Sequence, residues 1–98
     1  MKITHTMIGN LLTIHINEHI TGMQEVGVIK TIVKANDGFD TIKLDIVDAF
    51  VIPSALIGYL MKLTNIDKKN ISIIAHQKEL NQLLIDLQLD QLFRLNRG

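Results

Sequence analysis

Apolar and polar residues alternate at a two-residue spacing near the start of the chain. Leu12, Ile14 and Ile16 are separated by polar residues, as in a strand that buries one face. The preceding segment is also rich in Ile and Thr, and a Gly-Asn pair at 9–10 lies between the two. Such a pair between strand-like segments is typical of a tight hairpin. The pattern therefore predicts two paired strands, Ile3–Ile8 and Leu11–Ile16.

The apolar spacing lengthens to three and four residues further along, which indicates helices. Thr21 suits an N-cap, and behind it Val26, Ile29, Ile32 and Val33 follow a helical period. Pro53 suits the first turn of a helix, where an N–H is not needed. We expect helices from Thr21 to about Ala35, from Pro53 with Leu56, Leu60 and Leu63 buried, and over Gln77–Leu87 with Leu80, Leu83, Leu84 and Leu87 buried.

Shorter apolar segments between these helices predict further strands. They are Thr41–Val47 and Ile71–Ala75, with a short closing strand or turn at Asp90–Leu95. Strands that alternate with helices form a sheet covered by those helices. The sequence thus predicts one α/β domain over residues 1–98, with a mixed sheet of about four to five strands and about three helices packed on it.

Composition narrows the classes of function. The 98 residues include ten basic, ten acidic and no cysteine residues, so neither a broad nucleic-acid surface nor a thiolate or disulfide site is expected. No apolar run approaches the roughly 20 residues of a membrane span, and the first residues lack the apolar region of a signal peptide. We expect a cytoplasmic protein that neither binds nucleic acid nor inserts into a membrane.

Candidate chemistry is sparse. His15 and His19 are four residues apart, a spacing that suits two metal ligands on one helix, but we place His15 in a strand and His19 in a loop. The paired carboxylates are Asp45 with Asp48 and Asp37 with Asp40. No nucleophile–base pair or phosphate-binding glycine loop accompanies them. We interpret these residues as structural or solvated, and expect no metal, no cofactor and no catalytic residue.

The centre of the chain has a distinctive order of segments: Pro53-Ser54-Ala55-Leu56-Ile57-Gly58 follows a strand, and a further strand, a helix and a Phe93 ending follow over 70–93. In this order and spacing the chain resembles a STAS domain, the fold of anti-sigma factor antagonists. The similarity covers roughly residues 10–95. Pro53 stands where the family usually has Asp, Leu56 where it has Gly, and Thr21 where an Asp is common. The resemblance implies a single STAS-type domain.

The resemblance also implies a function: a non-enzymatic regulator that binds a protein partner such as an anti-sigma factor or serine kinase. Ser54 matches the serine that such a kinase phosphorylates; alternatively it is only a residue that favours a helix start. The partner-binding candidates are Ile20, Thr21, Met23, Phe50, Val51, Ile52, Pro53, Ser54 and Tyr59. For Val51, Ile52 and Met23, packing into the core is the alternative.

Two other functions remain open for a STAS-like chain. One is a small scaffold subunit that binds the ATPase of a phospholipid-transport ABC complex. The other is a sensor of a nucleotide or another small ligand, for which the sequence offers no phosphate cradle. The sequence does not specify the oligomeric state.

Overall fold

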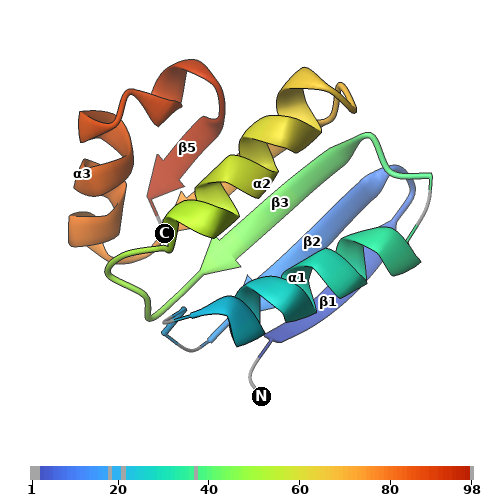
Figure 1. The fold of residues 1–98 in the computed structure, drawn as a ribbon, viewed down its shortest axis with the longest axis horizontal. Helices are drawn as coiled ribbons and strands as arrows, with labels where there is room; N and C mark the ends of the chain where they lie inside the picture. Colours follow the sequence, from blue (N-terminus) through green and yellow to red (C-terminus); the bar gives the residue numbers. More distant parts are fainter. Residues whose placement is uncertain (1–2, 18, 21, 37, 98) are drawn as a thin grey trace.

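The computed structural model describes residues 3–17, 19–20, 22–36 and 38–97, and it confirms the predicted α/β class. Figure 1 labels its helices and strands. In chain order they are β1 (Ile3–Ile8), β2 (Leu11–Ile16), α1 (Met23–Ala35), β3 (Thr41–Ile46), α2 (Ser54–Asn65), β4 (Asn70–Ala75), α3 (Lys78–Asp86), a 3-10 turn (Leu89–Gln91) and β5 (Arg94–Arg97).

The strands lie side by side in the order in which they occur in the chain, β1-β2-β3-β4-β5. β1 and β2 are antiparallel, and the later pairs are parallel. Each crossover therefore moves one strand further in the same direction, and right-handed crossovers then place their helices on one face of the sheet. Figure 1 shows this arrangement, with α1 and α2 in front of the strands and α3 beside β5 at the end of the sheet. The described part of the chain is therefore a two-layer domain that leaves one face of the sheet uncovered.

A two-residue turn joins β1 to β2 and also fixes the start of β3. Gly9 has a φ of 57°, which suits the first central position of a type II′ turn. The carbonyl of Asn10 accepts hydrogen bonds from the backbone N–H groups of Asp40 (3.0 Å) and Thr41 (3.2 Å). The hairpin tip therefore sets the register in which β3 begins beside β2.

The covered face of the sheet forms the core. Ile14, Leu44 and Ile73 are register partners on three adjacent strands, and all three are fully buried. The helices pack aliphatic residues on this row, among them Ile29, Leu56, Leu60, Leu80 and Leu84. No polar residue in the described part of the chain is buried. Burial of apolar surface therefore drives the association of the two layers.

The predicted elements agree with the structure to within a residue or two, but one expected core residue is wrong. Leu87 is 50% exposed because α3 ends at Asp86 and Gln88 adopts a left-handed conformation with φ 59°. This turns the chain, and Leu89 is buried instead. The closing segment holds both a 3-10 turn and a strand, β5.

The helix starts also differ slightly from expectation. Pro53 is the N-cap of α2 rather than its first helical residue. The expected N-cap at Thr21 lies outside the described residues; Gly22 precedes α1, and its N–H donates to the Glu25 carboxylate (3.1 Å). None of the helices in the described ranges is long and apolar enough to cross a membrane.

Leu84→Ala and Leu87→Ala form a matched test of this packing. Leu84 is fully buried and Leu87 half-exposed, so the first substitution leaves a cavity and the second does not. We expect Leu84→Ala to lower the free energy of unfolding by about 2–5 kcal/mol and Leu87→Ala by less than ~1 kcal/mol. Urea unfolding measures both, and equal losses would contradict the assignment of Leu87 to the surface.

Candidate functional site

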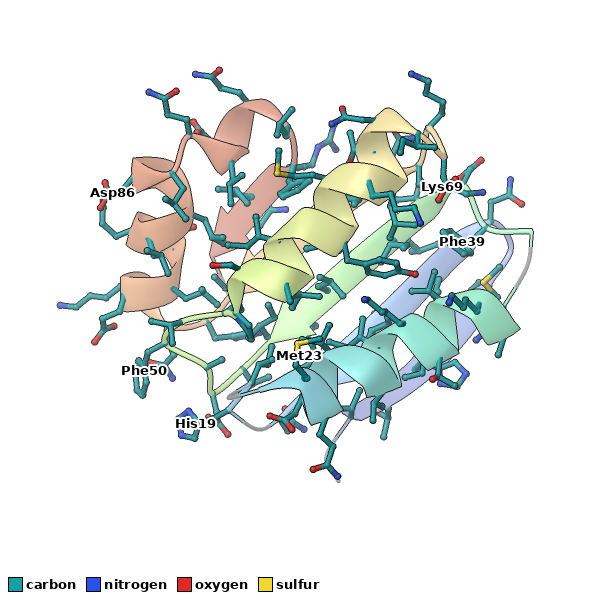
Figure 2. All side chains as sticks on the ribbon, in the orientation of Figure 1. His19, Met23, Phe39, Phe50, Lys69 and Asp86 are labelled. Carbon is teal, nitrogen blue, oxygen red and sulfur yellow. The ribbon has the colours of Figure 1, made fainter. Side chains whose placement is uncertain are left out.

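Two loops meet where β2 and β3 end: the loop before α1 and the loop before α2. Parallel strands bring their carboxyl ends to the same edge of a sheet, which explains the meeting. The His19 ring stacks on the Phe50 ring with 5.8 Å between centroids, and Figure 2 shows both at this end of the molecule. The structure therefore brings together the two regions named as partner-binding candidates.

The candidates divide into exposed and buried side chains. Met23 is 64% exposed, Val51 61% and Phe50 44%. Ile20 and Ile52 are only 2% and 7% exposed, so the expectation that they offer docking surface is wrong for their side chains. They anchor their loops in the core, which was the alternative reading for Ile52. The candidate Thr21 lies outside the described residues.

Pro53 and Tyr59 are half-buried. Tyr59 lies further along α2, where the ammonium group of Lys30 in α1 lies 5.2 Å from the centre of its ring. Burial raises the pKa of the Tyr59 phenol, and the negative charge of Asp67 raises it further. Tyr59 therefore serves the packing of α2 beside α1, away from the meeting loops.

Phe50, Val51 and Ser54 form a surface that we call the loop surface. Shallow grooves surround it. Phe50 and Val51 line one groove of about 360 Å³ with His19 and Pro53, and another of about 670 Å³ against α3. Ser54 lines a third, of about 530 Å³, between α2 and the turn that follows α3. The exposed apolar residues thus lie between hollows that a partner could fill.

The backbone around the loop surface is held at both ends. The N–H of Val47 donates to the carbonyl of Ile16 (3.0 Å), and the Val47 carbonyl accepts from the side-chain amide of Gln77 (3.2 Å). Ala49 and Ile52, on either side of Phe50 and Val51, are buried. The exposed pair therefore stands on a fixed loop.

Ser54 is the first residue of α2, and its side chain is exposed. The Pro53 carbonyl accepts from the N–H groups of Leu56 (3.0 Å) and Ile57 (3.2 Å). The first N–H groups of a helix lack partners within it and carry partial positive charge. The first turn of α2 contains no acidic residue, so its own side chains do not neutralise that charge.

A polar cluster, separate from the loop surface, lies on the uncovered face of the sheet. The Asp45 carboxylate lies between two rings, with His15 Nδ1 3.0 Å from Oδ2 and His76 Nε2 2.5 Å from Oδ1. A carboxylate can only accept, so both nitrogens donate. Asp45 is therefore hydrogen-bonded, and the expectation of a solvated strand-end carboxylate is wrong.

The positions of these residues at the ends of the predicted strands could have indicated the cluster from the sequence. His15 and Asp45 are each the next-to-last residue of neighbouring parallel strands, and His76 directly follows β4. His19, four residues after His15, does not belong to this cluster, because its ring stacks on Phe50. In the described ranges, no group of three or more His, Cys, Asp or Glu residues could hold a metal ion.

The other carboxylates fit the expected surface roles where they are described. Asp48 is exposed, and Asp40 is exposed while accepting a hydrogen bond from the Thr41 hydroxyl (3.1 Å). Asp37 lies outside the described residues. Among the described members of these pairs, Asp45 is therefore the one that joins two histidine side chains.

Opposing effects set the pKa of Asp45. Partial burial alone would raise the pKa of its carboxyl group, but hydrogen bonds from His76 and His15 and their charge outweigh it, so the pKa falls below its ordinary value. The folded state therefore binds this proton more weakly than the unfolded chain does. The resulting stabilisation is complete above the ordinary pKa and is lost as the pH falls through the lowered one.

We expect Asp45→Asn to reduce the free energy of unfolding by about 1 kcal/mol near neutral pH, because charge-assisted hydrogen bonds are replaced by neutral ones. The difference between wild type and variant should shrink as the pH falls through the lowered pKa of the wild-type carboxyl group. Urea unfolding at several pH values measures this. A difference that does not change with pH would argue against the role of the ionised carboxylate.

No protein-family model matches this chain, and neither a curated protein nor a solved structure gives a significant match.

Proposed function

We propose that the protein is a non-enzymatic regulatory domain that binds a protein partner through the loop surface, in the manner of an anti-sigma factor antagonist. The observation that carries the proposal is the exposure of Phe50 and Val51 on a loop whose neighbours on both sides are buried. Grouped apolar side chains at the surface mark interaction sites. Aromatic residues in particular are enriched where proteins bind each other.

The rigidity of the loop favours binding. Partners lose affinity when loops must be ordered on association. Here the hydrogen bonds of Val47 and the buried Ala49 and Ile52 hold the loop in place before any partner arrives. The loss of conformational entropy from ordering this loop therefore occurs largely on folding and not on binding.

The topology supports a protein partner over a small ligand. Open α/β sheets bind small ligands in the crevice where the strand order reverses. The order of the described strands is β1-β2-β3-β4-β5 without reversal. The hollows beside the loop surface are open grooves of mixed lining, which suit a complementary protein surface.

Ser54 is the proposed point of control. A phosphate on its hydroxyl would carry nearly two negative charges and would be stabilised by the N–H groups that open α2. The same charges would stand beside Phe50, Val51 and an apolar groove. Phosphorylation would therefore leave the fold intact and weaken the docking of an apolar partner surface.

Val51→Lys and Ile66→Lys test the surface as a matched pair. Val51 is 61% and Ile66 67% exposed, but Ile66 lies at the far end of α2, where a Lys suits the helix dipole. The tagged protein is used to capture partners from a lysate of its source organism, and the captured protein is then titrated against each variant. We expect Val51→Lys to weaken binding at least about tenfold, or about 1.4 kcal/mol, and Ile66→Lys to leave it unchanged.

The identity of the captured protein decides the class of regulation. A serine kinase that adds one phosphate to the wild type but none to Ser54→Ala would support the switch. An ATPase subunit of a transporter, bound without modification, would replace the switch by a scaffold function. Equal binding by both lysine variants would reject the loop surface itself.

We expect Ser54→Glu to weaken partner binding and Ser54→Ala to leave it near the wild-type value. The glutamate places negative charge in the first turn of α2, where it is compatible with the helix, so the variant should remain folded. Circular dichroism checks the fold, and titration with the captured partner measures affinity. Wild-type affinity of Ser54→Glu would remove Ser54 from the docking region.

A further inference from the structure

The two edges of the sheet differ in their protection against pairing with another chain. β5 spans only four residues and carries the charged Arg94, and both a short strand and a charged side chain discourage edge pairing. β1 spans six residues, Ile-Thr-His-Thr-Met-Ile, with no Lys, Arg, Asp, Glu or Pro. Its register with β2 runs over all six residues without a bulge. Within the described residues β1 therefore forms an uninterrupted edge of the sheet, with no strand beyond it.

The hairpin turn determines which groups face outward. In a two-residue hairpin the residues that flank the turn, here Ile8 and Leu11, exchange hydrogen bonds with each other. Alternation along the strand then directs Thr4, Thr6 and Ile8 toward β2. The N–H and C=O groups of Ile3, His5 and Met7 consequently point away from the sheet.

Apolar surface accompanies these groups. Ile3 and Met7 are partly buried against the core on the helix side. Above them, Lys30 marks the flank of α1 that faces α2, since it reaches Tyr59. Helical geometry places Val28 and Ile32, both half-buried, on the opposite flank. Figure 1 shows α1 running in front of β1, so this flank adds apolar surface beside the β1 edge.

We propose that two copies of this chain pair through β1 in antiparallel orientation, about a two-fold axis at His5. In this register Ile3 faces Met7 of the second copy, His5 faces His5, and Thr4 faces Thr6. This register places every outward-facing residue of β1 opposite an outward-facing residue of the second copy. The two strands can then form about six backbone hydrogen bonds.

The side chains also match in this register. Ile3 and Met7 extend the apolar layer under the helices, and Thr4 and Thr6 form hydroxyl pairs of the kind favoured across strands. Because β1 contains no Lys, Arg, Asp or Glu, no such side chains of like charge face each other between the two copies. The interface is isologous, as in most homodimers, and it leaves the loop surface at the carboxyl ends of the strands free.

His5→Cys tests the register, because the chain has no cysteine of its own. Residues in a hydrogen-bonded antiparallel pair have Cα atoms about 5.5 Å apart, within the range of a disulfide. Two copies of His5→Cys should therefore cross-link nearly completely under mild oxidation. Thr4→Cys is the control, since its two thiols would be offset by about 7 Å along the strands and should not cross-link.

The mass in solution tests the dimer without a cross-link. Light scattering should give twice the chain mass of 11.0 kDa for the wild type. His5→Lys and His5→Glu each place like charges opposite each other and should be monomeric, while an equimolar mixture should recover the dimer. His5 is exposed, so both variants should keep the wild-type circular dichroism spectrum.

A monomeric wild type at tens of micromolar would overturn the proposal. So would a dimer that persists in both charge variants, or equal cross-linking of the two cysteine variants. The loop surface is tested separately with a captured partner, so failure of the dimer and failure of partner binding are distinguishable.

Discussion

The parallel register of β2, β3 and β4 is the constraint on which the rest of the structure depends. It aligns Ile14, Leu44 and Ile73 in one buried row, and a slip of one residue would turn these side chains to the uncovered face. The same alignment joins His15 to Asp45 on that other face. It also makes the strands end together, so that the loops that present Phe50, Val51 and Ser54 meet. Core, polar cluster and loop surface are thus three results of one register.

The two faces of the sheet serve different purposes. The buried side chains that β2, β3 and β4 direct to the covered face are all aliphatic, and this face gains its stability from their burial. The uncovered face holds hydroxyl, imidazole, carboxylate and cationic side chains, and Asp45 links the end of one strand to the ends of two others. Such cross-strand hydrogen bonds add specificity to a register that the apolar residues select. They also mean that the carboxyl ends of the strands, where the loop surface begins, are held by side chains as well as by backbone.

The sequence predicts the helices and strands well because their buried apolar residues recur at the spacing of a strand or of a helix. Leu12, Ile14 and Ile16 are fully buried, as their alternation requires. The pattern fails where the chain turns. Leu87 fits the helical spacing of α3, but the helix has already ended and Gln88 then reverses the chain. Loops have no period, so Ile20 and Ile52 could not be separated from Val51 and Phe50 before the structure was known. The partner of His15 was missed because it is thirty residues away, in a neighbouring strand.

The order of the strands has a consequence for the way the chain assembles. Each strand after the first lies beside its predecessor, so no strand has to be inserted between two that are already paired. Pairings between successive strands keep the sequence separation of contacts low, which speeds folding. The sheet can therefore grow in the direction of synthesis, from the hairpin to the short final strand, with each new helix covering the strand that has just been added.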